Sequence, residues 1–101
     1  MSDDSQIVVP PSFVALFVPA GRIRPTAPRE EIAARYEVCE DLAQALVETA
    51  RTKAFQLGID ASDVLGRIAA GLAAQPELVS PAEAVWVRRR LAELLGWDDI
   101  G

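Results

Sequence analysis

Residues 28–57 decide the fold, and they read PREEIAARYEVCEDLAQALVETARTKAFQL. Pro28 suits the first turn of a helix, and neither glycine nor proline occurs again before Gly58, a typical residue after a helix end. Apolar residues recur mostly at spacings of three and four: Ile32, Tyr36, Cys39, Ala43, Leu46, Ala50 and Leu57. Because such spacings place side chains on one face of a helix, the stretch predicts one long amphipathic helix over 28–57.

Two shorter helices are predicted after it, each with its own start signal. Asp60 opens a helix over 61–74, whose apolar face consists of Val64, Leu65, Ile68 and Leu72. Ser80 and Glu83 form a capping-box pattern around Pro81, which predicts a helix over 81–95 closed by Gly96. Its apolar face consists of Ala84, Val87, Leu91, Leu94 and Leu95. Short connections favour antiparallel neighbours, so the predicted fold class is all-α, a three-helix antiparallel bundle with one long helix.

A Pro-rich leader over residues 7–25 precedes these helices, and residues 1–6 are expected to form a disordered polar tail. The leader has two candidate structures: a helix over 13–17 capped by Ser12, which we favour, or a strand over 13–18 that turns at 19–21. The long helix would span about 45 Å, beyond the roughly 33 Å of a compact domain this size. The helix could kink, a partner could cover its excess length, or the leader could pack along it. We favour the last, and we expect a single domain over 1–101 with the leader packed on the first half of that helix.

The composition excludes several classes of function. The chain has 101 residues, no histidine, one cysteine and a net charge of −5. Without histidine there is no imidazole base or imidazole metal ligand, and one cysteine cannot form an internal disulfide. The negative charge argues against nucleic acid as a partner, and no apolar run is long enough for a membrane span. Since the N-terminus is acidic where a signal peptide is basic, the expected compartment is the cytoplasm.

The sequence also gives little support for a metal site, a catalytic carboxylate, a reactive cysteine or a nucleotide-binding loop. Glu37, Glu40 and Asp41 lie within about one helical turn and could hold a cation or act in acid–base catalysis, but a solvated helix face explains them more simply. Cys39 has acidic neighbours, so it is interpreted as a small buried side chain rather than a reactive thiol. The phosphate-binding loop of nucleotide triphosphatases is missing, and the only lysine is Lys53. We expect no catalytic residue, no cofactor and no metal site.

Two aromatic residues lie away from the predicted apolar faces. On a helical wheel Phe55 falls on the polar side of the long helix, and Trp86 falls opposite Leu91, one turn from Arg90. Trp86 and Arg90 could stack as a cation–π pair, and exposed Trp and Arg are enriched where proteins bind each other. The alternative is that the leader or the Trp97 tail of the same chain covers these residues. Phe55, Trp86 and Arg90 are the candidate protein-interaction residues.

Three stretches resemble a group of small uncharacterised proteobacterial helical proteins, some of which are labelled as an ATPase with chaperone activity. These stretches are VPPSFVALF at 9–17, AARYEVCEDLA at 33–43 and LAELLGW at 91–97. The resemblance covers most of the chain but supplies no mechanistic motif, so no site residue follows from it. Because the phosphate-binding loop is missing, the resemblance implies a partner of a chaperone machine rather than an ATPase.

The predicted function is a non-enzymatic, cytoplasmic, helical protein-interaction module. The alternative is a small-ligand or carrier-type binding protein with a pocket between the leader and the bundle. An enzyme that uses Glu37, Glu40 or Asp41 is the third class. The expected partner is another protein, and the chain is expected to be a monomer, with a homodimer through the long apolar face as the alternative.

Overall fold

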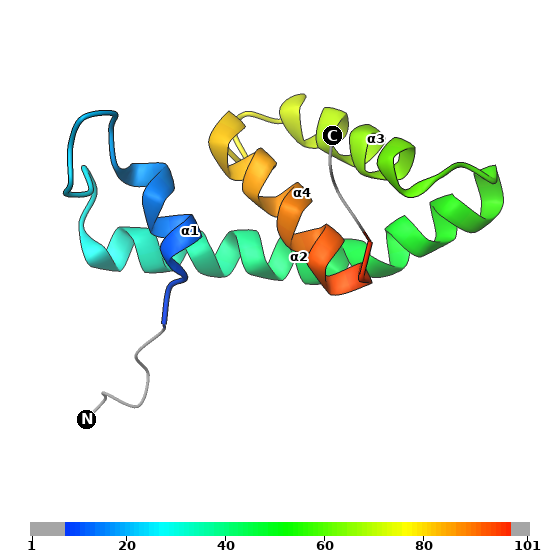
Figure 1. Ribbon diagram of the computed structural model, residues 1–101, viewed down its shortest axis with the longest axis horizontal. Helices are drawn as coiled ribbons and strands as arrows, with labels where there is room; N and C mark the ends of the chain where they lie inside the picture. The colour runs from blue at the N-terminus through cyan, green and yellow to red at the C-terminus, as the bar shows by residue number, and fades with distance from the viewer. Residues whose placement is uncertain (1–7, 98–101) are drawn as a thin grey trace. The chain divides into compact units, whose positions relative to one another are not determined.

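The computed structural model describes residues 8–97, and every regular element in this range is helical (Figure 1). The elements in chain order are α1 (Pro11–Val14), the 3₁₀ helix η2 (Ala15–Phe17), α2 (Arg29–Leu57), α3 (Ala61–Ala73) and α4 (Pro81–Leu95). The prediction of an all-α chain is thus confirmed for residues 8–97, whereas the expected tail over 1–6 lies outside them. In the same range, no helix combines the length and apolarity that a bilayer-crossing segment requires.

The chain divides into two compact units, residues 1–38 and residues 39–101, and α2 contributes its first turns to one and the remainder to the other. The leader belongs to the first unit, and its helical alternative is the one observed. Helix α1 begins at Pro11, and the carbonyl of Pro10 accepts the backbone N–H groups of Phe13 and Val14 at 3.0 and 3.1 Å. The helix thus begins before Ser12, so Ser12 is not its N-cap as expected. Proline suits the first turn, because the backbone N–H that it lacks would have no partner within the helix there.

The core of the first unit is aromatic. The Phe13 side chain is completely buried, and its ring centroid lies 5.6 Å from that of Phe17 and 5.7 Å from that of Tyr36 on α2. The ring planes of Phe13 and Tyr36 meet at 66°, an edge-to-face arrangement that is favourable for aromatic pairs. Phe13 therefore joins the leader to the first turns of α2.

The second unit contains the rest of α2 together with α3 and α4, and its helix ends are made by the residues that the sequence singles out. Asp60 accepts the backbone N–H of Asp63 at 2.9 Å to start α3. Ser80 and Glu83 form the reciprocal capping box of α4, with N–O distances of 3.1 and 2.8 Å. After α2 and α4 the chain turns through Gly58 and Gly96, whose φ angles of 63° and 72° are left-handed.

Helices α3 and α4 pack side by side in opposite directions (Figure 1). Val64 and Leu65 of α3 and Val87 and Leu91 of α4 are completely buried, as their positions on the predicted apolar faces require. The apolar face of α2 is buried at Ile32, Cys39, Ala43 and Ala50, but Leu57 is 52% exposed. That face ends at Ala50 because no large apolar side chain follows on it before Leu57.

Candidate functional site

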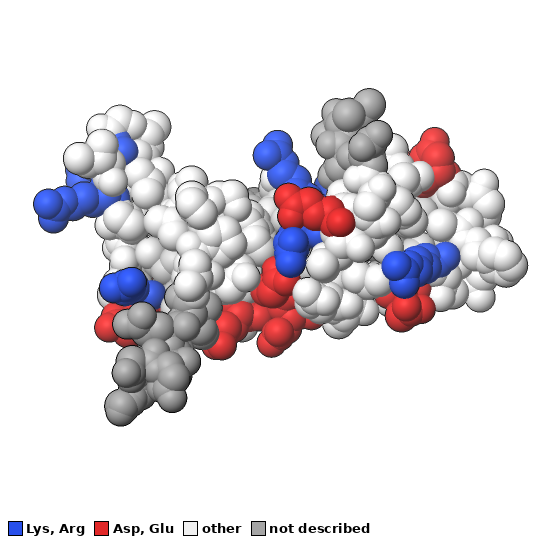
Figure 2. Space-filling model, turned by 60° about the horizontal axis from the view of Figure 1, so that its bottom comes forward, with Lys and Arg blue, Asp and Glu red and all other residues white. Residues whose placement is uncertain are grey.

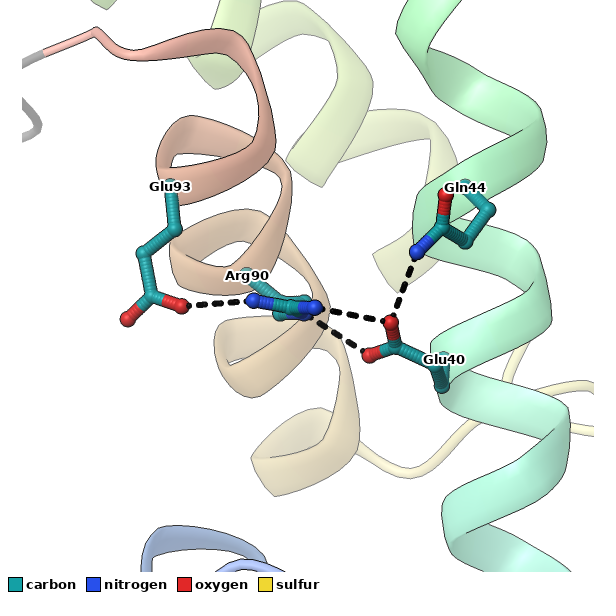
Figure 3. Close-up of polar contacts among 4 residues, drawn as sticks. All are labelled: Glu40, Gln44, Arg90 and Glu93. Carbon is teal, nitrogen blue, oxygen red and sulfur yellow. Dashed lines mark hydrogen bonds and ion pairs between the residues drawn. The ribbon is translucent and has the colours of Figure 1, made fainter.

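An ion pair joins α2 to α4 inside the second unit (Figure 3). The guanidinium of Arg90 donates from Nε to Glu40 Oε1 at 2.8 Å and from its second terminal nitrogen to Oε2 at 3.0 Å. Gln44 Nε2 also donates to Oε2 of Glu40, at 2.8 Å, and the first terminal nitrogen of Arg90 donates to Glu93 at 3.1 Å. Both oxygens of Glu40 are therefore occupied, in the two-pronged geometry that makes Arg–carboxylate pairs strong.

The electrostatics of this network follow from its geometry. The hydrogen bonds from Arg90 hold the pKa of the Glu40 carboxyl below its ordinary value of 4.5, against the opposing effect of partial burial. The same pair raises the pKa of Arg90, chiefly through the hydrogen bond to Glu40. A carboxylate in this state stays ionised near neutral pH, so it is poorly suited to accept a proton from a substrate.

The three carboxylates singled out in the sequence have different surroundings. Glu40 is half-buried in the network with Arg90, whereas Glu37 and Asp41 are exposed. Among residues 8–97 no group of three or more Cys, Asp or Glu side chains is placed to hold a metal ion. Cys39 is completely buried, as the interpretation of it as a small core side chain requires.

We predict that Glu40→Gln lowers the free energy of unfolding by about 1 kcal/mol at neutral pH, since a charge-assisted pair is replaced by a neutral one. Because the folded pKa of Glu40 is lowered, the stabilising effect of the pair is complete above pH 4.5 and is lost as the pH falls through the folded value. The difference between wild type and variant should therefore shrink below about pH 4.5. Urea denaturation of both proteins at several pH values measures this difference in the free energy of unfolding.

Glu93→Gln is the matched control for this prediction. Glu93 also contacts Arg90, but its side chain is 68% exposed against 16% for Glu40. Exposed ion pairs contribute little, typically about 0.2–1 kcal/mol, because water and salt screen them. Equal losses in the two variants would contradict the larger contribution expected for Glu40.

The structure separates the three candidate interaction residues. Trp86 is buried, with 7% of its surface exposed, so the expectation of an exposed tryptophan is wrong. The guanidinium of Arg90 is directed to Glu40 rather than presented to a partner. The helical wheel failed because α4 is buried on two sides: its buried residues are Glu83, Ala84, Trp86, Val87, Leu91 and Ala92.

Phe55 is the candidate that the structure leaves on the surface. Its side chain is 90% exposed, in the last turn of α2. Arg51 and Glu48 lie four and seven residues before it and so share its face of the helix. These two side chains pair with each other at 3.3 Å. An isolated aromatic ring thus projects from a polar face.

Sequence reasoning missed the pairing of Glu40 with Arg90, although it noted both residues. They are 50 positions apart, and nothing in the local pattern links them. It also attached no function to Ile23, which is 92% exposed in the segment between η2 and α2. No family model, no curated protein and no solved structure matches this chain, so the resemblance to the proteobacterial group stays a prediction.

Proposed function

We propose that the chain is a non-enzymatic helical protein-interaction module and that Phe55 is an anchor for its partner. The observation that carries this proposal is the 90% exposure of Phe55. A phenylalanine side chain offers a large apolar area, and leaving it in water forgoes about 1.5–3 kcal/mol that burial would supply. A partner with an apolar pocket would recover that free energy on binding.

The surroundings of Phe55 support an anchor with a polar rim. Binding sites often place one aromatic side chain at the centre and ring it with polar groups that exclude water. Glu48 and Arg51 supply such groups on the same face of α2, at 81% and 57% side-chain exposure. The scaffold that we propose for this surface is the antiparallel three-helix bundle, in a monomeric cytoplasmic protein that is a partner of a chaperone machine.

Site-specific photo-crosslinking tests the proposal. A photoreactive phenylalanine analogue at position 55, introduced in the native host, should form a covalent adduct with one defined protein. The same analogue at Ala45, an exposed position earlier on α2, should form little or none. Purified Phe55→Ser should then bind that protein roughly 30-fold more weakly than the wild type, the loss expected for an anchor worth about 2 kcal/mol.

The control variant is Val85→Ser, which removes an apolar side chain that is 55% exposed on α4. Both Phe55→Ser and Val85→Ser should melt within a few degrees of the wild type, because surface substitutions rarely change stability by more than about 0.5 kcal/mol. Equal adducts at 55 and 45, or undiminished binding by Phe55→Ser, would contradict the proposal. Native mass spectrometry addresses the alternative: a retained small molecule would favour the carrier-type protein.

A further inference from the structure

The segment between η2 and α2 presents an apolar side chain between two basic ones. Arg22, Ile23 and Arg24 are all exposed, and Ile23 is the most exposed large apolar residue in the described part of the chain, at 92%. We call these three residues the Arg-Ile-Arg tip. Isoleucine is among the residues most often buried, whereas Ile23 is almost completely exposed between two charged side chains.

The loop that carries this tip is held in shape by its own backbone. The carbonyl of Phe17 accepts two hydrogen bonds from Thr26, one from the backbone N–H at 2.8 Å and one from Oγ1 at 3.1 Å. The backbone N–H of Arg22 donates to the carbonyl of Pro19 at 3.0 Å, which closes a turn whose third residue, Gly21, has a φ of 80°. A turn at 19–21, which only the strand alternative for the leader placed there, is thus present, although the segment before it is helical.

Two further features reduce the freedom of the loop. Pro19, Pro25 and Pro28 each fix one backbone dihedral angle. The hydrogen bonds between Thr26 and Phe17 bring the two ends of the loop together. Phe17 also contacts the buried ring of Phe13 in the core of the first unit. A loop that is ordered before binding loses less conformational entropy when a partner docks, which favours recognition.

The charge of the segment is opposite to that of the chain. Residues 18–29 contain three arginines and no acid, whereas the whole chain has a net charge of −5. None of Arg22, Arg24 and Arg29 forms an ion pair with another residue of the described range. Basic side chains stand out from this end of the first unit in Figure 2. The tip therefore offers guanidinium groups that form no ion pair with a carboxylate of residues 8–97.

We propose that the Arg-Ile-Arg tip is a docking surface for an acidic protein segment that has an apolar residue or pocket at its centre. Carboxylates of the partner would receive the two-pronged hydrogen bonds of Arg22 and Arg24, and Ile23 would be buried between them. This surface lies in the first unit and Phe55 lies in the second, so the proposal does not depend on the role of Phe55.

A protein segment fits this surface better than an anionic membrane or a nucleic acid does. At physiological ionic strength charges interact over about 8 Å, so a small partner would sense mainly the arginines of the loop. A bilayer or a duplex carries many negative charges over a larger area, and the net charge of −5 on the chain opposes its approach. A single isoleucine and two or three arginines also supply little of the binding free energy that stable membrane attachment requires.

Panning a displayed random-peptide library against the full chain tests the proposal. We expect the enriched peptides to be acidic and to share a large apolar residue, and we expect their affinity to fall as salt is raised. The double variant Arg22→Glu/Arg24→Glu and the single variant Ile23→Ser should each weaken these peptides by about tenfold or more. When an enriched peptide is added to the wild type, the backbone NMR chemical shifts should change mainly within residues 18–29.

The controls make the same kinds of substitution at exposed positions outside the tip. Arg67→Glu reverses an exposed arginine on α3, and Val8→Ser removes an apolar side chain that is 87% exposed in the first unit. Both should bind the peptides as the wild type does, and so should Phe55→Ser, which separates this surface from the proposed anchor. The proposal is overturned by a library that yields no acidic peptides, by peptides that bind the double variant equally well, or by stronger tip-dependent binding to phosphatidylserine vesicles than to any peptide.

Discussion

Trp86→Ala is expected to lower the free energy of unfolding by about 3–5 kcal/mol, the usual loss when a buried large aromatic side chain is truncated. Trp86 is 7% exposed, and its neighbours Ala84 and Val87 on α4 are also buried. Domains of this size have only about 5–15 kcal/mol in total, so the melting temperature should fall by more than about 10 °C. Thermal denaturation followed by far-ultraviolet circular dichroism measures the change.

The destabilisation expected for Trp86→Ala also limits what this variant can show about function. Loss of a partner by Trp86→Ala would report unfolding rather than a missing contact, so this variant cannot test an interaction surface. Trp86→Phe should recover most of the lost stability, because it restores an aromatic ring to the same buried position. Val85→Ala, at an exposed position of the same helix, should change the melting temperature little. A Trp86→Ala protein as stable as the wild type would show that Trp86 is not in the core.

Phe13→Ala is expected to have an effect of the same size, about 3–5 kcal/mol, on the packing of the first unit. Phe13 is completely buried and is the ring that contacts both Phe17 and Tyr36. Without it the leader loses its ring contact with Tyr36 of α2. Tyr36 is the only tyrosine of the chain, so its ring resonances report directly on this contact. They should shift toward the values of an unfolded tyrosine, and the melting transition should move to lower temperature.

Phe17→Ala is the matched control, because Phe17 is only half-buried and lies in the same short segment. It should cost less than Phe13→Ala, since fewer of its atoms are removed from water. Calorimetry would show whether the first unit melts together with the second or earlier, which matters because the two-state treatment applies only in the first case. Unchanged Tyr36 resonances in Phe13→Ala would contradict the contact between the leader and α2.

The helix boundaries could be derived from the sequence because they depend on local chemistry. A proline at the start of α4, a side chain that caps the first turn and a glycine after the last turn each act within a few residues. Ser80, Glu83 and Gly96 illustrate this, since all their capping contacts span five residues or fewer. The burial of Val64, Leu65, Val87 and Leu91 also follows from helical periodicity alone.

The candidate site was harder to derive, because a helical wheel shows only one helix at a time. It separates a strongly apolar stripe from the rest, but it does not show whether a second element covers another side. Trp86 lies on such a second side of α4, so the wheel placed it in water whereas the structure buries it. Phe55 lies on a side of α2 that no described element covers, and there the wheel and the structure agree.

The sequence by itself determined that the described chain is helical, where α3 and α4 begin and end, and which residues form their main apolar faces. Only the tertiary structure decided that Arg90 pairs with Glu40, that Trp86 is buried and that Ile23 is exposed. The physical reason is the sequence separation over which these interactions act. Capping and periodicity act over a few residues, whereas burial and ion pairing depend on which segments meet after the chain has folded, here across 50 positions for Glu40 and Arg90.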